Sequence, residues 1–446
     1  MEDIYVLSMS PRSKKDIKLG LNIYPKKHHG DGYLVYNWTS IKETYKLATK
    51  IAIIELPKND TEFKMYKHNP CNDYLWIMNR IIVKKIYSLF DLNTYLDLGL
   101  NITDNIHIVD LASINNRVDF LEWWINSEHD LKYSSSSIDH ATYRGNLDIL
   151  KWWISSGKKL IYSELALFNA STQSRIDILN WWIEQNIPLY YDENIIDTLS
   201  EEGLVEILNW WKNSGLEIKY THKAIDQASF NGHINILNWW LDSDLPLKYT
   251  KKSMNFTDVE CLDWWLSSGL ELKYDKTTID FASWCGRIDA LNWWKESGLT
   301  LKYSESSIDG ACEYDTAISV IEWWIESGLE IRYSHKAMDT ASAYDHVDVL
   351  EWWKNSGLEL YYSCESISDA CKNNNIKVLE WWKNSGLNIL MPNNITEIVI
   401  IHCDTPVLDW CHSVGIKFDI DVKYLNSIKK SCYFDNTLWF KKHHYI

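Results

Sequence analysis

The stretch Ile288–Tyr303, IDALNWWKESGLTLKY, is one copy of a unit that recurs along most of the 446-residue chain. A double tryptophan marks each copy, and the ten pairs begin at Trp123, Trp152, Trp181, Trp210, Trp239, Trp264, Trp293, Trp323, Trp352 and Trp381. Seven of the nine steps between them are 29 residues long, one is 25 and one is 30. A fixed period of this size is typical of repeat proteins, in which each copy packs against its neighbours.

Each copy predicts two short helices and a connector. In the copy that starts at Thr221, this residue would cap a first helix that ends at Gly232, and His233–Ser243 would form the second helix. The cap position holds a short oxygen-bearing side chain in nine successive copies: Ser134, Ser163, Asp192, Thr221, Thr250, Asp275, Ser304, Ser334 and Ser363. The apolar residues of the second helix recur at helical spacing, so we interpret the tryptophan pairs as core.

The repeat register extends beyond the ten pairs. Counting 29 residues back from Trp123 reaches Thr94-Tyr95, and the same step forward reaches Trp410 and Trp439. We therefore predict a repeat domain over residues 91–446, with capping half-repeats at its ends. The copy near residues 250–262 is four residues short, so its first helix should lose about one turn. That loss would either bend the stack or be compensated locally.

Residues 1–90 do not repeat, and they predict a small α+β domain. Four apolar runs read as strands, at Tyr33–Tyr36, Lys50–Leu56, Glu62–Tyr66 and Tyr74–Tyr87, with a short helix at Ser40–Ala48. The predicted fold class is mainly α: a helix-pair solenoid preceded by this small α+β domain.

Charge and composition narrow the classes of function. The formal net charge is −16, which argues against a nucleic-acid partner because such proteins carry a basic surface. Nine scattered cysteines fit a reducing compartment, and neither a signal peptide nor an apolar run of membrane-spanning length is present. We therefore expect a cytoplasmic, monomeric protein that is not secreted and has no membrane partner.

The sequence supports no catalytic chemistry. Its serine, histidine and aspartate residues fall in repeat columns, and no phosphate-binding glycine motif is present. His402, Cys403, Cys411 and His412 are the one metal-like cluster, but the cysteine spacing is not that of a zinc site and Cys411 occupies a tryptophan column. We expect no catalytic, cofactor-binding or metal-binding residues, and no enzyme.

The unit resembles the ankyrin repeat. Ala228-Ser229, then two variable residues, then Gly232-His233 and an apolar helix match the ankyrin pattern, with tryptophans where ankyrins carry leucines. The period is shorter than the ankyrin length of about 33, and the Thr-Pro-Leu-His motif is absent, which puts long β-hairpin fingers in doubt. The nearest resemblance is to ankyrin-repeat proteins of giant amoebal viruses of the Mimivirus type.

The resemblance implies a protein-binding surface. In ankyrin stacks the two variable residues that close the first helix face the partner on a concave side. Carried over by column, the candidate partner-binding residues are Tyr143, Arg144, Phe230, Asn231, Trp284, Glu313, Tyr314 and Tyr344. Aromatic residues are common in binding hot spots, and the acidic chain suggests a partner with a basic surface.

Four functions are compatible with these features of the sequence. The first is a non-catalytic scaffold that binds host or viral proteins. The second is an adaptor of the ubiquitin-ligase type that recruits machinery through residues 1–90. The third is a structural component of a virion, and the fourth is an enzyme in the N-terminal domain, which no acid, base or nucleophile set supports.

Overall fold

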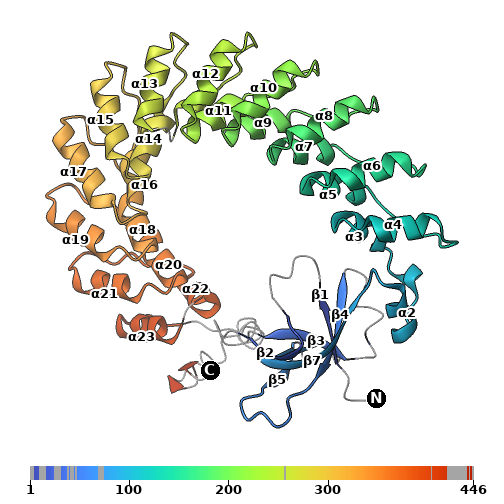
Figure 1. Ribbon diagram of the computed structural model, residues 1–446. Coiled ribbons are helices and arrows are strands. Elements are labelled where there is room, and N and C mark those ends of the chain that lie inside the picture. The colour runs from blue at the N-terminus through green and yellow to red at the C-terminus, as the bar shows by residue number, and fades with distance from the viewer. Residues whose placement is uncertain are drawn as a thin grey trace. The chain divides into compact units, whose positions relative to one another are not determined.

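The computed structural model describes residues 5–9, 17–24, 32–37, 40, 45, 48–68, 75–255, 258–402, 404–418, 439–440 and 442–443. The chain forms two compact units. The N-terminal unit comprises residues 1–199 and 206–220, and the C-terminal unit comprises residues 200–205 and 221–446. The described residues form 22 α-helices and one antiparallel sheet (Figure 1), so the predicted mainly α repeat fold is confirmed. The domain boundary near residue 90 stays a prediction.

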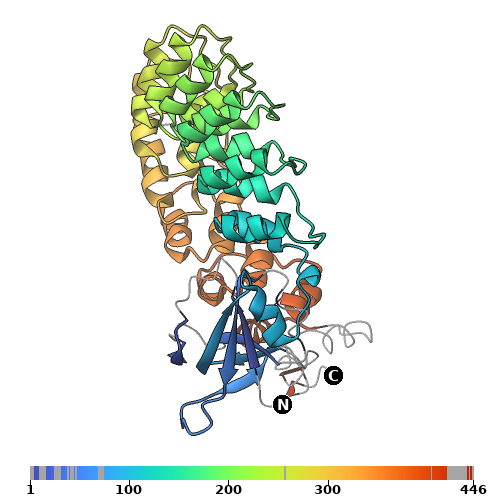
Figure 2. The same cartoon turned by 45° about the vertical axis from the view of Figure 1, so that its right-hand side comes forward.

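The sheet belongs to the N-terminal unit (Figure 2). Its strand order is β2-β7-β4-β1-β3-β6-β5. Its strands are β1 (Tyr5–Met9), β2 (Gly20–Ile23), β3 (Tyr33–Asn37), β4 (Lys50–Glu55), β5 (Met65–Lys67), β6 (Leu75–Met78) and β7 (Arg80–Ser88). The predicted strands at 33–36 and 50–56 are confirmed, the run at 62–66 overlaps β5, and the run at 74–87 is divided into β6 and β7. The sequence did not predict β1 and β2, and most of the expected helix at 40–48 lies outside the described residues.

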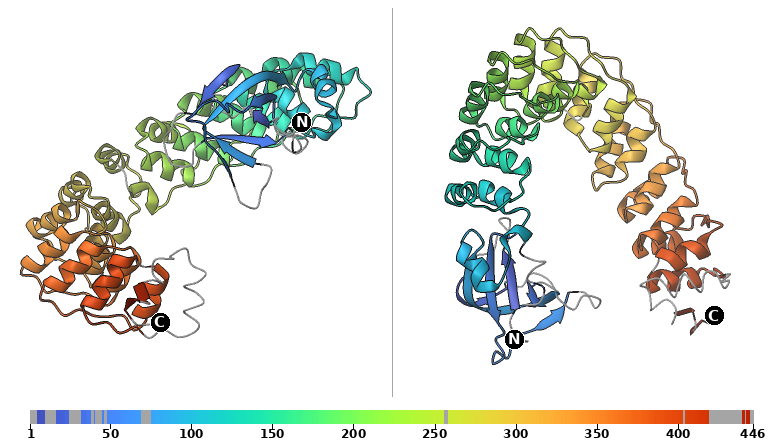
Figure 3. Two further views of the ribbon diagram at one scale, coloured as in Figure 1. Left: turned by 90° about the horizontal axis from the view of Figure 1, so that it is seen from below. Right: turned by 90° about the vertical axis from the view of Figure 1, so that its right-hand side faces the viewer.

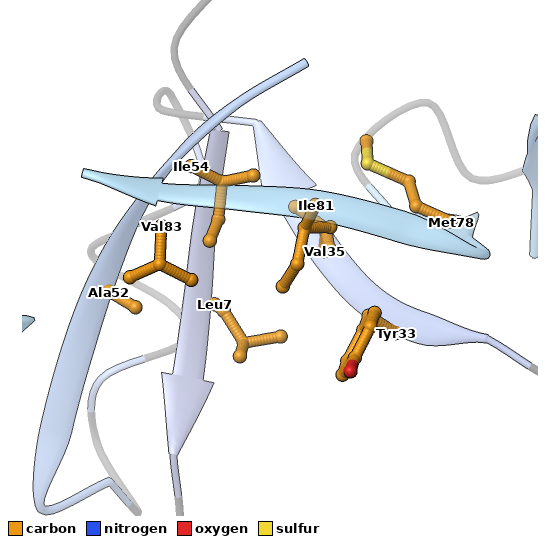
Figure 4. Packing of buried hydrophobic residues seen from close by; sticks show 8 residues of the cluster. All are labelled: Leu7, Tyr33, Val35, Ala52, Ile54, Met78, Ile81 and Val83. Carbon is orange, nitrogen blue, oxygen red and sulfur yellow. The ribbon is translucent and has the colours of Figure 1, made fainter. Parts of the chain in front are cut away.

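One apolar cluster holds the sheet together (Figure 4). It consists of Leu7, Tyr33, Val35, Ala52, Ile54, Met78, Ile81 and Val83, each no more than 6% exposed. Hydrogen bonds then join residues that flank the strands to the start of the helices: the Tyr45 hydroxyl donates to the Asn101 carbonyl at 2.9 Å, and the Tyr95 hydroxyl donates to the Leu89 carbonyl at 2.9 Å. The sheet and the start of the repeats therefore form a continuous structure within the N-terminal unit.

After α2 (Leu92–Leu98) and the 3-10 turn η3 (Ile102–Asp104), helix pairs follow one another as far as Ser413. The first helices are α3 (Ile108–Ile114), α5 (Ser136–Arg144), α7 (Leu165–Thr172), α9 (Asn194–Glu201), α11 (Lys223–Phe230), the 3-10 turn η4 (Lys251–Met254), α14 (Lys276–Trp284), α16 (Ser306–Ala311), α18 (Lys336–Ala343), α20 (Glu365–Lys372) and α22 (Ile395–His402). The second helices are α4 (Val118–Ile125), α6 (Leu147–Ser155), α8 (Ile176–Glu184), α10 (Val205–Asn213), α12 (Ile234–Asp242), α13 (Val259–Ser267), α15 (Ile288–Glu296), α17 (Ala317–Ser327), α19 (Val347–Asn355), α21 (Ile376–Asn384) and α23 (Thr405–Ser413). Within each unit the first helices lie side by side in one row and the second helices in another (Figure 3).

The second tryptophan of each pair is the core of its copy. In all ten pairs this indole is at most 2% exposed. Its Nε1–H donates to a serine hydroxyl on the first helix of the preceding copy in six described cases: Trp153 to Ser113, Trp211 to Ser171, Trp240 to Ser200, Trp265 to Ser229, Trp324 to Ser283 and Trp382 to Ser342, at 2.8 to 3.2 Å. Neighbouring copies are thus joined by a buried hydrogen bond as well as by apolar packing.

The first tryptophan of each pair lies nearer the surface. In five described pairs its Nε1–H donates to a polar side chain on the second helix of the preceding copy, as from Trp293 to Asp263 at 2.6 Å and from Trp381 to Glu351 at 2.7 Å. Trp439 makes the same contact with Asp409 at 2.6 Å, which confirms the predicted register at that position.

An aspartate in the first helix clamps the cap of the next copy. Asp139 accepts from the Ser163 amide at 3.0 Å and from the Ser163 hydroxyl at 2.7 Å. Asp110, Asp226, Asp280, Asp309 and Asp339 make the same pair of contacts. All nine predicted cap residues also accept a hydrogen bond from a first-turn amide, so the capping prediction is confirmed.

The short copy keeps the tryptophan contacts with the preceding copy. Its first helix is reduced to η4, as the four-residue deletion predicted. Trp265 still reaches Ser229, at 2.8 Å, and the Tyr249 ring still packs on Trp265 with ring centroids 4.9 Å apart. The deletion is compensated locally.

Two copies replace the acceptor serine with cysteine. Cys312 occupies the acceptor position opposite Trp353, so the indole N–H faces a thiol sulfur and has no oxygen acceptor among the described residues. A thiol sulfur is a weak acceptor, and burial raises the pKa of the Cys312 thiol to about 12, so no thiolate forms to serve instead. A buried donor without a good acceptor costs free energy.

We predict that Cys312→Ser raises the free energy of unfolding of the C-terminal unit by about 1 kcal/mol, because the indole N–H gains an oxygen acceptor. Urea denaturation followed by tryptophan fluorescence measures this change. The matched control is Ser283→Cys, which removes the acceptor of Trp324 and should lower stability by a similar amount. A loss of stability in Cys312→Ser contradicts the assignment.

Candidate functional site

The candidate residues lie at the carboxyl ends of the first helices. Tyr143 and Arg144 end α5, Phe230 ends α11, and Trp284 ends α14. Glu313 and Tyr314 follow α16, and Tyr344 follows α18. The rings of Tyr143, Phe230, Tyr314 and Tyr344 are between 42% and 51% exposed. These helix ends therefore present aromatic side chains to solvent.

Four of the eight residues come together around one carboxylate. Trp284 Nε1 donates to Glu313 Oε2 at 2.9 Å, and the ring centroids of Trp284 and Tyr314 are 6.2 Å apart. A hydrogen bond with the Glu313 carboxylate raises the pKa of Tyr344. Burial raises the pKa of Tyr314, and the Glu313 charge adds to that rise. We call Trp284, Glu313, Tyr314 and Tyr344 the aromatic–acidic site.

A groove of about 390 Å³ runs along α14 and α16 to this site. The rings of Phe281 and Trp284 line it, with centroids 5.0 Å apart and planes at 81°. Gly310 provides the space: a Cβ on this residue would lie 3.2 Å from Trp284 Cδ1. The missing side chain lets the indole lie close to α16.

The two ends of the groove differ in charge. Lys276 and Lys336 line the end near the helix amino termini, and Glu313 lines the other. Asp280 and Asp309 also line the groove, but their oxygens accept the cap hydrogen bonds of Ser304 and Ser334. The Glu313 carboxylate is therefore the acid best placed to receive a ligand.

The other four candidates are not part of this site. Tyr143 and Arg144 belong to the N-terminal unit. Phe230 and Asn231 precede the short copy, and the Asn231 side-chain amide donates to the Glu201 carbonyl at 2.9 Å. Whether any of the eight residues binds a partner stays a prediction.

Phe281 and Gly310 were missed in the sequence. Both occupy the column between the clamping aspartate and the alanine of the first helix. Gly310 is the one glycine in that column, a departure that could have marked the groove.

The described residues contain no group of three histidine, cysteine, aspartate or glutamate side chains placed to hold a metal ion. Cys403, one member of the metal-like cluster, lies outside them. No helix in the described ranges is both long and apolar enough to cross a membrane.

No known protein-family model matches the chain. An uncharacterized protein of Acanthamoeba polyphaga mimivirus is 41% identical over 109 residues. This match covers 24% of the chain and 33% of the relative, so it spans about a third of that protein's length. The relative supports the expected link to giant viruses, whereas no comparison identifies the repeats as ankyrin repeats.

Similar solved structures are helical repeat proteins. The pentatricopeptide repeat protein PPR10 in complex with an 18-nt psaJ RNA element has a TM-score of 0.36 and 11% identity, over 75% of this chain and 57% of that chain. PPR10 from maize has a TM-score of 0.25 and 12% identity, over 79% of this chain and 59% of that one.

The expectation of no nucleic-acid partner is contradicted by this comparison, because two of the similar structures hold RNA. The expectation was wrong because it rested on net charge alone. A total of −16 describes the whole chain and does not exclude a local surface that contacts phosphate.

Asp275 caps α14 beside the groove, and its ion pair makes the stability of the fold depend on pH. Asp275 pairs with Lys251 at 2.5 Å and accepts from the Thr277 amide at 2.9 Å. The Lys251 hydrogen bond, with that of Thr277, lowers the pKa of Asp275 from 3.8 to about 2. Because folding depresses this pKa, the ionised carboxylate stabilises the fold above about pH 4, and that stabilisation is lost as pH falls toward 2.

We predict that Asp275→Asn, which keeps the cap and removes the charge, lowers the free energy of unfolding by less than about 1 kcal/mol near neutral pH, since the pair is exposed. The difference from wild type should shrink as the pH falls through 4, as measured by urea denaturation at several pH values. The matched control is Asp192→Asn, which changes a cap that has no ion pair in the described residues. A difference that grows on acidification contradicts the prediction.

Proposed function

We propose that the chain is a non-catalytic scaffold of ankyrin-like repeats that binds a protein partner at the ends of its first helices. One observation carries the proposal: Trp284, Tyr314 and Tyr344 surround Glu313 at the ends of three successive first helices. Surface aromatic side chains held by rigid elements are the kind of residue that dominates protein-binding energy.

The distribution of constant and variable residues within the repeats supports this proposal. The tryptophan, aspartate and cap columns make the same contacts copy after copy, whereas the ends of the first helices differ in residue type. Variation confined to one edge of a constant framework suits recognition of another macromolecule. The mimivirus relative supports a viral origin, with a host or viral protein as the partner.

Two alternative roles remain within the proposal. Residues 1–90 could recruit machinery, which would make the chain an adaptor for the bound partner. A partner from the capsid would instead make it a structural virion component. In all of these roles the repeats supply binding rather than chemistry.

The proposal predicts that a tagged full-length chain retains a specific protein from extracts of virus-infected amoebae. The variant Trp284→Ala/Glu313→Gln/Tyr314→Ala/Tyr344→Ala should lose at least about tenfold of the retained protein, as expected when hot-spot residues are removed. Mass spectrometry of the captured material measures the loss.

The control variant is Tyr190→Ala/Tyr361→Ala, which removes two exposed rings from connectors and should retain the partner. Thermal denaturation of both variants checks that the fold is kept. Retention of RNA in place of any protein, or equal retention by both variants, overturns the proposal.

A further inference from the structure

The aromatic–acidic site has a chemical preference that follows from its contents. Glu313 is half-buried between rings, and no lysine or arginine of the described chain forms an ion pair with it. The indole N–H of Trp284 engages one of the four lone-pair sites on this carboxylate. The carboxylate can still accept two hydrogen bonds.

The imidazole of His346 contacts the backbone of Glu313 and not its carboxylate. His346 Nε2 lies 2.9 Å from the Glu313 carbonyl oxygen, which can only accept, so this nitrogen donates. Nδ1 of the same ring faces Asp315 at 3.5 Å. His346 thus holds the backbone of Glu313 in place and leaves its carboxylate unneutralised.

At other places in this chain, a cationic side chain covers an aromatic ring. The guanidinium carbon of Arg332 lies 5.0 Å from the centre of the Tyr303 ring, while its Nε donates to Glu330 at 3.0 Å. Lys302 covers Tyr274 at 4.4 Å, and Lys273 covers Tyr249 at 4.3 Å. Among the described residues no such cation covers Trp284, Tyr314 or Tyr344. The aromatic–acidic site therefore has the rings and the acid of the Arg332 arrangement without its cation.

We propose that this site binds an arginine side chain of the partner protein, with its guanidinium stacked on Trp284 and hydrogen-bonded to Glu313. This inference rests on the proposed function, since it names the residue that the partner supplies. A guanidinium is favoured over an ammonium because its planar group stacks on an indole and its forked donors fit a carboxylate. It is also less strongly hydrated, so its transfer to a half-buried site costs less.

Gly310 sets the depth of the site. Since a Cβ there would press on Trp284 at 3.2 Å, any larger residue would displace the indole toward the space that the guanidinium needs. The lysines at the far end of the groove repel further positive charge. One arginine, rather than a run of basic residues, is therefore the expected occupant.

The test uses the full-length chain labelled with 5-fluorotryptophan, in which Trp284→Phe identifies the Trp284 resonance. N-acetyl-arginine methylamide should shift this resonance with a dissociation constant on the order of millimolar, as expected for so small a ligand. The uncharged isostere N-acetyl-citrulline methylamide and the lysine analogue should bind at least about tenfold more weakly. Glu313→Gln and Gly310→Ala should each weaken arginine binding by a similar factor.

The matched control is Glu201→Gln. Glu201 occupies the Glu313 column in an earlier copy, but the preceding copy there carries Thr172 in place of Trp284, so arginine binding should not change. Equal shifts with citrulline or lysine overturn the arginine assignment, as does undiminished binding by Glu313→Gln. Partner capture that is unaffected by Glu313→Gln overturns the inference alone, whereas arginine binding without any captured partner overturns the proposed function alone.

Discussion

The packing of the repeats depends on the buried indole N–H of the second tryptophan in each pair, which needs an oxygen acceptor. The second indole of each pair is sealed from water, and an unpaired donor there would cost about 1 to 3 kcal/mol. Its usual acceptor is the serine hydroxyl on the preceding copy, as for Trp324 and Ser283. Burial of each indole removes about 150–250 Å² of surface from water. Apolar packing thus drives the association of copies, and the hydrogen bond sets their register.

This constraint explains where the chain is free to vary. Tryptophan, serine, aspartate and the connector tyrosines are all engaged in contacts between copies; for example, the Tyr333 ring packs on Trp353 and its hydroxyl donates to the Glu359 carbonyl. The last residues of the first helices make few of these contacts. Differences in binding chemistry can therefore accumulate there without loosening the stack, and Trp284, Glu313 and Tyr344 lie in that region.

Much of the repeat fold could be predicted because its signal is local and periodic. The spacing of the tryptophan pairs, the cap residues and the terminating glycines each determine where a helix begins or ends within one copy. The deletion near residue 250 correctly predicted the loss of a helical turn. The partners of the side chains could not be predicted in the same way. Asp139 meets Ser163 from 24 residues away, and Trp153 meets Ser113 from 40, so only packing of copies reveals them.

The candidate site shows the same division. The column rule selected Trp284, Glu313, Tyr314 and Tyr344, yet it gave equal weight to Tyr143 and Phe230, which lie outside the cluster. The rule did not select Phe281 and Gly310, because the ankyrin resemblance assigns no binding role to the position between the clamping aspartate and the alanine. The strands β1 and β2 were missed since they are short and flanked by residues without a clear alternating pattern. Net charge, a property summed over the whole molecule, misled the expectation about nucleic acid.

The four-residue turn η4 has a consequence for how such chains change in evolution. The Ser229 hydroxyl of the preceding copy receives the Trp265 indole N–H and donates to the Ser253 carbonyl. The Thr278 hydroxyl of the following copy donates to Asn255 Oδ1, so the truncated copy is still bonded to both neighbours. Recombination between similar gene segments commonly adds or deletes units imperfectly. A coupling that survives such an unequal exchange lets the gene lengthen, shorten and diversify while its product continues to fold.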